Sequence, residues 1–272
     1  MDIKKAVIPV AGLGKRFSPI SRTIPKAMMP LIDRPVLDYA IFEAIESGIN
    51  EIFVVMSPSQ NMIIDYYEND PTLPNQPVQN QIRKHIKKSI LLENSVQLHF
   101  AIQEKPLGLG NAILVTKEFI EQDPFVIILP DDLIFAQKAI TLSMINYFNH
   151  FNSNIIAVRE VQNELINQFG IVEIKENLLK DHFSPVKSMI EKPKLNESTS
   201  NLAIVGRYIL LPSIFESLEN TSPGANNEIQ LTDAISTLLA KQETYAFNFE
   251  GNHFDVGNPA GLIEASNFFN KR

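Results

Sequence analysis

Apolar runs of strand length alternate with stretches of helical spacing through the first half of the chain. In residues 36–48, for example, Leu37, Ile41 and Ala44 fall on one side of a helix, and Gly48 is a suitable place for that helix to end. The predicted strands of this half cover 6–10, 51–56, 96–102 and 125–129. The predicted helices cover 36–48, 59–68, 80–92 and 109–120. This β-α-β-α order predicts a mostly parallel sheet with helices on both faces.

The second half of the chain has a more β-rich and mixed pattern. Its predicted strands cover 155–160, 170–174, 188–191, 203–211 and 244–249. Its predicted helices cover 212–220, 229–241 and 259–269. The segments 71–77 and 193–201 are rich in proline or polar residues and are predicted to be loops. No internal repeat or clear linker interrupts the pattern, so we interpret residues 1–272 as a single domain.

The composition is that of a globular α/β protein. Hydrophobic residues make up 44% and charged residues 20% of the 272 positions, which excludes wholesale disorder. No apolar run reaches the roughly 18 residues that a membrane helix needs. The first residues lead directly into a strand-like run and not into a long signal-peptide core. Cysteine is absent, which excludes disulfides and thiolate chemistry. Together these features predict a cytoplasmic protein with no membrane partner.

The charge balance bears on the kind of ligand that the protein can bind. Lysine and arginine number 24 against 31 aspartates and glutamates, so the formal net charge is −7. An acidic protein lacks the basic face that general nucleic-acid binding requires. A few cations gathered in one cleft could still bind the phosphates of a small molecule.

Two segments near the N-terminus could bind phosphate. Residues 11–16 (A-G-L-G-K-R) follow the first strand, and glycines allow backbone N–H groups to approach a ligand closely. This is neither a Walker A loop nor G-x-G-x-x-G, and a purely structural turn is an equal alternative. Lys26 follows Pro25 in a proline-stiffened loop, so it is either held in place or an ordinary solvated lysine.

Three further segments carry carboxylates at the ends of predicted strands. Asp131, in L-P-D-D, is placed either to bind Mg²⁺ or to cap a helix. Asp255, in F-D-V-G, could complete a metal site with Asp131 or stabilise a turn. Glu191 and Lys192 could bind a sugar phosphate together only if their strand ends or bulges there, and a surface ion pair is the alternative. The five histidines show no metal-binding spacing.

The order of these fragments along the chain resembles the bacterial UTP–glucose-1-phosphate uridylyltransferases. The fragments are A-G-L-G-K-R-F-x-P, I-P-K-A-M-M-P, P-L-G-L-G-N-A, L-P-D-D, F-G-I-V, E-K-P, V-G-R-Y, N-E-I-Q-L-T-D-A and F-D-V-G. The resemblance spans nearly the whole chain, from Lys5 to about Ala265. It implies a Rossmann-like nucleotidyltransferase fold, a mixed sheet flanked by helices with a smaller inserted β-rich sugar-binding region. It also implies transfer of a uridylyl group from UTP to glucose 1-phosphate with Mg²⁺ as cofactor, in a homo-oligomer (dimer or tetramer).

The resemblance also implies a role for individual residues. Those implied for the nucleotide are Ala11, Gly12, Gly14, Gln103, Gly108 and Asp131, with Gln103 and Gly108 at the uracil. Those implied for the sugar phosphate are Asn111, Gly170, Glu191, Lys192 and Gly206. Arg16, Lys26 and Lys192 are implied as catalytic cations, and Asp131 and Asp255 as ligands of Mg²⁺.

Two positions depart from the resemblance and leave alternatives open. Ala27 stands where these enzymes commonly have Glu, and Asn111 stands where His is frequent. Either change could alter nucleotide or sugar preference. One alternative is a glucose-1-phosphate thymidylyltransferase, which shares the glycine loop and the central aspartate. The other, raised by Ala27 alone, is a weakly active, nucleotide-binding regulatory paralogue.

Overall fold

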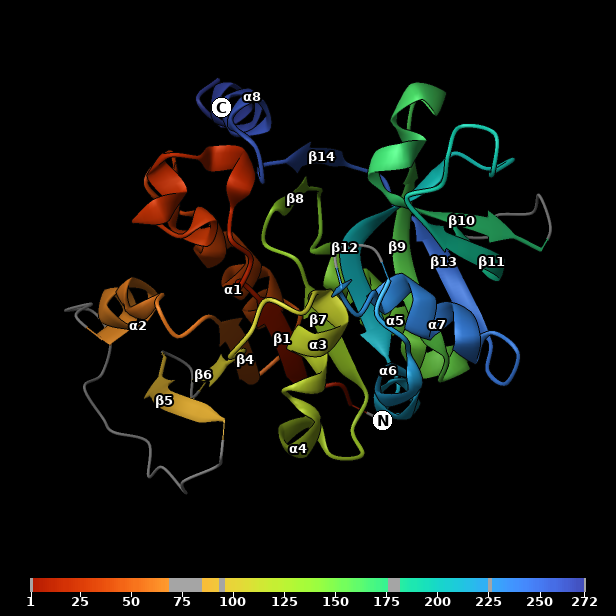
Figure 1. Cartoon of the computed structure of the whole chain (residues 1–272), viewed down its shortest axis with the longest axis horizontal. Helices are drawn as coiled ribbons and strands as arrows, with labels where there is room; N and C mark the ends of the chain where they lie inside the picture. The colour runs from red at the N-terminus through yellow and green to blue at the C-terminus, as the bar shows by residue number, and fades with distance from the viewer. Residues whose placement is uncertain (1, 69–84, 93–95, 176–181, 225–226, 272) are drawn as a thin grey trace.

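One mixed ten-stranded sheet forms the centre of the protein, in a computed structural model that describes residues 2–68, 85–92, 96–175, 182–224 and 227–271 (Figure 1). The strands of this sheet are β1 (Lys5–Pro9), β4 (Glu51–Met56), β5 (Ile86–Leu91), β6 (Gln97–Ile102), β7 (Phe125–Ile128), β9 (Asn154–Glu160), β10 (Gly170–Ile174), β11 (Phe183–Glu191), β12 (Leu202–Leu210) and β13 (Thr244–Asn248). Their order across the sheet is β10-β11-β13-β9-β12-β7-β1-β4-β6-β5.

The strands divide into a parallel half and a mixed half, as the sequence pattern predicts. Strands β7, β1, β4 and β6 are parallel neighbours, so the loops after them leave the same edge of the sheet. In the mixed half β12 runs antiparallel to β7 and β9, while β13 is parallel to β9. Ligands bind α/β sheets at the carboxyl ends of parallel strands. The edge after β1, β6 and β7 is therefore where a site is expected.

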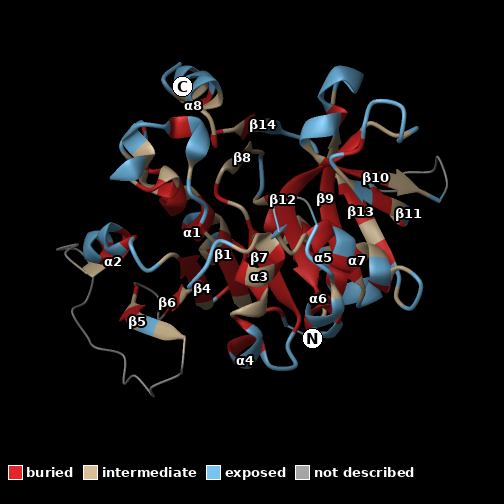
Figure 2. Cartoon of the chain, in the orientation of Figure 1, coloured by how far each residue is buried: buried red, intermediate tan, exposed pale blue. Residues whose placement is uncertain are grey.

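Helices cover both faces of the sheet. The helices are α1 (Val36–Glu46), α2 (Asn61–Glu68), α3 (Leu109–Leu114), α4 (Lys117–Ile120), α5 (Ile140–Phe151), α6 (Ser213–Asn220), α7 (Leu231–Leu238) and α8 (Pro259–Phe269). On β1, Ala6 and Ile8 pack with α1, α2 and α5, whereas Val7 packs with α3, α4, α6 and α7. This alternation follows from the two-residue period of a strand, and it leaves the central strands buried on both faces (Figure 2).

A small outlying layer lies beyond the sheet and carries one of the predicted metal ligands. It contains the short pairs β2 (Pro30–Leu31) with β3 (Arg34–Pro35) and β8 (Asp132–Phe135) with β14 (Asn252–Asp255). Helix α8 packs on this layer, and the chain ends there (Figure 1). No helix in the described part of the chain has both the length and the apolar character to cross a membrane.

The prediction of a helix over 80–92 is wrong where the structure describes it. Residues 86–91 form strand β5, which pairs antiparallel with β6, and 80–84 lie outside the described residues, as does the loop predicted over 71–77. The apolar spacing and the lysines of this segment resemble a helix with a solvated face. The segment instead forms a strand because it supplies the hydrogen-bonding partner that β6 needs. Strand β5 is the outermost strand of the sheet, where charged residues such as Lys87 and Lys88 are suited to an exposed edge.

The helix predicted over 109–120 is interrupted. Thr116 is fully buried, and its hydroxyl donates to the carbonyl oxygen of Ile113 at 2.7 Å. Such a side-chain hydrogen bond competes with the regular helical ladder, so the segment becomes α3 and α4. Helix α5 was not predicted, although Ile140, Met144 and Phe148 recur at helical spacing and are buried.

A buried ion pair joins the sheet to its helical cover. The guanidinium of Arg207 on β12 is paired with the carboxylate of Glu43 on α1 at 2.7 Å, and the two side chains are 2% and 11% exposed. Thr141 adds a hydroxyl hydrogen bond of 2.6 Å to the same carboxylate. Burial alone would raise the pKa of Glu43, but the charge and hydrogen bonds of Arg207 hold it below its ordinary value.

Replacing Glu43 by Gln is expected to lower the free energy of unfolding by about 3 kcal/mol at neutral pH, because Arg207 keeps a buried charge without its counter-ion. The folded-state pKa of Glu43 is depressed, so its contribution is present above the unfolded value of 4.5 and is lost as the pH falls through the folded value. Urea unfolding of both proteins between pH 7 and pH 3 tests this. The exposed Glu46→Gln is the control, and a pH-independent difference would contradict the assignment.

Candidate active site

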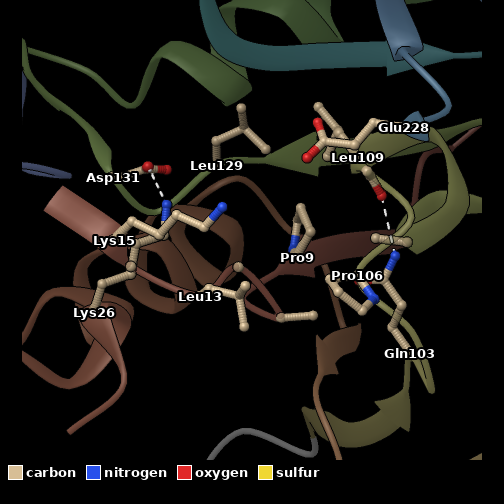
Figure 3. A pocket seen from close by; sticks show the side chains of 15 residues that line it. Pro9, Leu13, Lys15, Lys26, Gln103, Pro106, Leu109, Leu129, Asp131 and Glu228 are labelled. Atoms are coloured by element: carbon tan, nitrogen blue, oxygen red, sulfur yellow. Dashed lines mark hydrogen bonds and ion pairs between the residues drawn. The ribbon is translucent and has the colours of Figure 1, made fainter. Parts of the chain in front are cut away.

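A cavity of about 560 Å³ lies at the carboxyl ends of β1, β6 and β7 (Figure 3). Its lining residues are Pro9, Ala11, Gly12, Leu13, Gly14, Lys15, Lys26, Gln103, Pro106, Gly108, Leu109, Ala112, Leu129, Asp131 and Glu228. Lysines and Asp131 gather at one end, Gln103 lies at the other, and apolar side chains line the space between them. All six residues implied for the nucleotide line this one cavity.

The loop after β1 is a tight turn packed against Lys26. Gly14 has φ = +60°, in the left-handed region, and a Cβ atom there would lie 3.3 Å from that of Lys26. At Gly12 a Cβ would lie 3.6 Å from Lys26 Cε. The loop is therefore a tight structural turn that also forms a wall of the cavity, and phosphate binding by this loop stays a prediction.

Lys26 is held in place by an ion pair. It begins the short 3₁₀ helix η3 (Lys26–Met28), and its Nζ atom donates to Asp131 Oδ2. The side chain is 20% exposed, so the interpretation as a freely solvated lysine is wrong. Its neighbour Ala27 is buried in the core and does not line the cavity.

Asp131 and Asp255, 124 positions apart in sequence, converge on the side chain of Arg16. Arg16 Nη1 lies 2.7 Å from Asp255 Oδ2, and Nη2 lies 3.9 Å from Asp131 Oδ2. The backbone brings the two together, because the N–H of Val256 donates to the carbonyl oxygen of Asp131 at 2.8 Å. Asp131 caps no helix, since strand β8 begins at Asp132.

Cations determine the charge state of Asp131. Burial would raise its pKa, but the charge and hydrogen bond of Lys26, with a smaller effect of Arg16, hold the pKa below its ordinary value. The carboxylate is therefore ionised at neutral pH. Asp255 also serves the turn that follows it, because its Oδ1 accepts from the N–H of Gly257 at 3.0 Å. Asp255 therefore stabilises a turn and also lies beside Asp131, so the two interpretations are compatible.

At the other end of the cavity, Gln103 is anchored through its backbone and its side chain. Its N–H donates to the carbonyl oxygen of Met56 at 2.9 Å, where β4 ends. Its amide Nε2 donates to the carbonyl oxygen of Gly108 at 3.0 Å and to Asn111 Oδ1 at 2.8 Å. Asn111 is therefore a hydrogen-bond partner of Gln103, and its implied contact with a sugar stays a prediction.

Glu191 lies beside Gly170, with which it is paired in the β10–β11 ladder. A Cβ at Gly170 would lie 3.1 Å from Glu191 Oε2, and the hydroxyl of Thr232 donates to the same oxygen at 2.7 Å. Strand β11 ends at Glu191, and Lys192 has φ = +46°. This ending satisfies the condition for both side chains to serve one ligand.

The ion-pair alternative for these two residues also has support. Lys192 Nζ lies 3.2 Å from Glu191 Oε1, and the lysine side chain is 58% exposed.

Gly206 lies against the loop of Asp131, since a Cβ there would meet Asp132 Oδ2 at 2.5 Å. Gly170, Glu191, Lys192 and Gly206 do not line the cavity.

Sequence reasoning missed several residues at the site. Arg207 donates through Nη1 to the carbonyl oxygens of Leu129 and Asp132, at 3.0 and 2.7 Å, and so holds the loop that carries Asp131. An isolated arginine within the apolar run of β12 was the available signal, because a buried charge needs partners. Glu228, in N-E-I-Q-L-T-D-A, lines the cavity, and no sequence pattern assigns it there.

The sequence profile described as nucleotidyl transferase matches residues 5–272. The chain belongs to the nucleotidyl transferase family. It is 37% identical over 268 residues to the UTP–glucose-1-phosphate uridylyltransferase of Streptococcus pyogenes, covering 97% of this chain and 88% of that protein. It is 38% identical over 265 residues to the enzyme of the same name from Mycoplasma pneumoniae, covering 97% and 91%.

A crystal structure of a UDP-glucose pyrophosphorylase complexed with UDP-glucose superposes on this member of the nucleotidyl transferase family with a TM-score of 0.85. The two are 35% identical, and the match covers 99% of this chain and all of the other. The mixed sheet with helical covers on both faces is therefore the nucleotidyl transferase fold, and the fold prediction is confirmed.

The donor set at Asp131 and Asp255 suits a hard divalent cation. A Cβ at Gly257 would lie 2.8 Å from Asp131 Oδ2 and 3.0 Å from Asp255 Oδ1, so the two carboxylates border one small space. No group of three or more His, Cys, Asp or Glu able to hold a metal occurs among the residues that the structure describes. Mg²⁺ typically takes one or two carboxylates together with water and substrate phosphates, and this pair fits that pattern.

Replacing Gly257 by Ala is expected to weaken binding of a magnesium–nucleoside triphosphate about tenfold, because the site tolerates little displacement. The added carbon would lie 2.6 Å from Arg16 Nη2 and must move it or Asp131. Titration calorimetry measures the affinity. Gly224→Ala is the control, because the nearest atom to its Cβ is 3.6 Å away. Equal affinities for wild type and Gly257→Ala would show that this space is not part of the site.

Proposed function

We propose that this protein transfers a uridylyl group from UTP to glucose 1-phosphate and releases pyrophosphate. The observation that carries the proposal is the polarity of the cavity, with Lys15, Lys26 and Asp131 at one end and the Gln103 amide, together with the Glu228 carboxylate, at the other. A nucleotide fits such a cavity with its phosphates beside Lys26 and its base beside Gln103. The names of the relatives, uridylyltransferase and UDP-glucose pyrophosphorylase, specify UTP and the sugar.

The reaction needs positioning and charge compensation more than proton transfer. A phosphate oxygen of glucose 1-phosphate attacks the α-phosphorus of UTP, the bond to the β-phosphate oxygen breaks, and pyrophosphate leaves with that electron pair. The attacking oxygen is already anionic at neutral pH, so no general base is required. This agrees with a cavity that is lined by lysines and, among the described residues, by no histidine.

The chain's own cations reduce the repulsion between the substrates. Two unit charges about 4 Å apart repel by roughly 4 kcal/mol at an effective dielectric constant of 20, and several such pairs approach here. Lys26 and Arg16 would bind the triphosphate, and Lys192 the phosphate of the sugar. Lys26 and Arg16 are now paired with Asp131 and Asp255, so they exchange carboxylate partners for phosphates when the substrate binds.

Asp131 and Asp255 would hold Mg²⁺, which supplies further neutralisation of the phosphates when bound. The pKa of Asp131 lies below its ordinary value, so this carboxylate needs no deprotonation to act as a ligand. Glu191, with Gly170 and Thr232 around it, would accept hydrogen bonds from sugar hydroxyls. Cytoplasmic location and homo-oligomeric assembly stay predictions from the sequence.

Pyrophosphate release with glucose 1-phosphate and Mg²⁺ tests the function, with UTP, dTTP, CTP, ATP and GTP compared side by side. We expect strong preference for UTP. A preference for dTTP would identify a thymidylyltransferase. Release with none of the five would leave two options, another sugar phosphate as substrate or the binding-only paralogue. Tight UTP binding would distinguish both from a denatured preparation.

Lys192→Ala is expected to lower kcat/KM for glucose 1-phosphate about a hundredfold, because one charge that stabilises the transferring phosphate is removed. UTP affinity should stay unchanged. The control is Lys194→Ala, whose side chain is 82% exposed. Steady-state kinetics with varied sugar phosphate gives the comparison. Full activity of Lys192→Ala would show that the Glu191–Lys192 contact is only a surface ion pair.

A further inference from the structure

A third aspartate, Asp132, lies beside the two that border the space near Gly257. It follows Asp131 in the chain and stands directly opposite Asp255 in the antiparallel pair of β8 and β14. Residues in such opposite positions have Cβ atoms about 4.5–5.5 Å apart, so the Asp132 carboxylate could reach a cation held by Asp255. The described part of the chain nevertheless contains no group of three acidic or histidine side chains able to hold a metal. A contact elsewhere therefore keeps Asp132 out of such a group.

That contact is made by His253. Its Nε2 atom lies 2.7 Å from Asp132 Oδ1, and the two side chains are 7% and 18% exposed. A carboxylate oxygen accepts, so Nε2 is the donor, which it can be in the neutral as well as the charged imidazole. Among the described residues His253 is the one side chain that bonds to this carboxylate. Asp132 thus depends on His253 for its orientation.

The geometry of the strand pair explains how the histidine reaches its partner. His253 and Asp255 are two positions apart on β14, so their side chains leave the same face of the strand. Asp132 is opposite Asp255 and diagonal to His253, and its carboxylate bonds along the diagonal. Gly206 leaves room for the carboxylate, because a Cβ there would lie 2.5 Å from Asp132 Oδ2. Without the histidine, two like charges would face each other across the strand pair, an arrangement that is unfavourable.

We propose that His253 is a positioning residue that holds Asp132 away from Asp131 and Asp255 and so limits the cation site to two carboxylates. The inference rests on the proposed function, because it concerns the Mg²⁺ that this reaction would use. Mg²⁺ is typically bound by one or two carboxylates with water and phosphates, whereas Ca²⁺ takes six to eight oxygen ligands. A third carboxylate would strengthen cation binding before any nucleotide arrives and would favour Ca²⁺. His253 therefore leaves coordination positions open for phosphates and favours Mg²⁺.

The test measures binding of Mn²⁺ and of Ca²⁺ to the protein without nucleotide. His253→Leu removes the donor, and we expect it to bind both ions about tenfold more tightly than wild type, because Asp132 becomes free to act as a third ligand. His253→Gln keeps an N–H donor and should retain the wild-type affinities. Electron paramagnetic resonance of hydrated Mn²⁺ and calorimetry with Ca²⁺ give the dissociation constants. His253→Met replaces the leucine variant if thermal unfolding shows that the latter does not fold.

Loss of an imidazole could also strengthen cation binding by removing positive charge, and a double variant separates the two causes. His253→Leu combined with Asp132→Asn should return to the wild-type affinities, because the third carboxylate is then absent. Tight binding that persists in the double variant would overturn the inference, as would equally tight binding by His253→Gln. Equal affinities of wild type and the folded leucine variant, including no detectable binding by either, would also overturn it.

The two proposals fail in different measurements. If wild type releases no pyrophosphate with any nucleotide, the proposed function fails. The cation affinities require neither substrate nor turnover, so they still decide the inference about His253.

Discussion

The buried pair of Arg207 and Glu43 is the interaction on which the geometry of the site depends. Arg207 reaches out of the central sheet in two directions, to Glu43 on the covering helix α1 and to the carbonyl oxygens of Leu129 and Asp132. Those carbonyls flank Pro130 and Asp131, so one guanidinium fixes the turn that aims the Asp131 carboxylate. A buried charge is costly to desolvate, and this cost is offset only because every strong partner of the arginine is an oxygen held by rigid structure. The apolar core could be built without this pair, but the loop at its edge could not be held in the same way.

A second consequence concerns the charges that the loop brings together. Asp131 and Asp255 would repel each other across the small space beside Gly257 if no cation lay between them. Lys26 and Arg16 supply that compensation in the free protein, and the same cations are the groups that phosphates would attract. The folded protein thus holds a set of charges that is balanced before substrate arrives and can be rebalanced around phosphates and a divalent ion. Preorganisation of this kind avoids much of the reorganisation that charged groups in water would need.

Local patterns predicted most of the fold, because the hydrophobic periodicity of a buried strand or an amphipathic helix is visible within a few residues. The failures have local causes too. Residues 86–91 have helical spacing, yet they form a strand that pairs with the edge of β6. The hydroxyl of Thr116 interrupts a helix whose apolar pattern continues. The motifs identified Lys26, Asp131 and Asp255 and suggested that the two aspartates share a metal site, whereas the position of both aspartates against Arg16 depends on strand pairing between β8 and β14 that no local signal predicts. Arg207 was visible only as an arginine in an apolar strand, and its partners lie 164 and 75 positions away.

The two ends of the cavity impose opposite requirements, and the fold meets them with different parts of the sheet. The end with Lys26 and Asp131 is built from the loops after β1 and β7, and Asp255 at the end of β14 is joined to it through Arg16, so its charges are matched only by tertiary structure. The opposite end is built mainly from the short segment 103–112, in which Gln103 donates to Gly108 and Asn111, with Glu228 beside Gly108. Within that segment a residue can change the hydrogen-bonding character of the cavity without disturbing the cations or carboxylates. In the proposed function the charged end would meet the phosphates and the Gln103 end would meet the base, so separate parts of the chain would serve the two requirements.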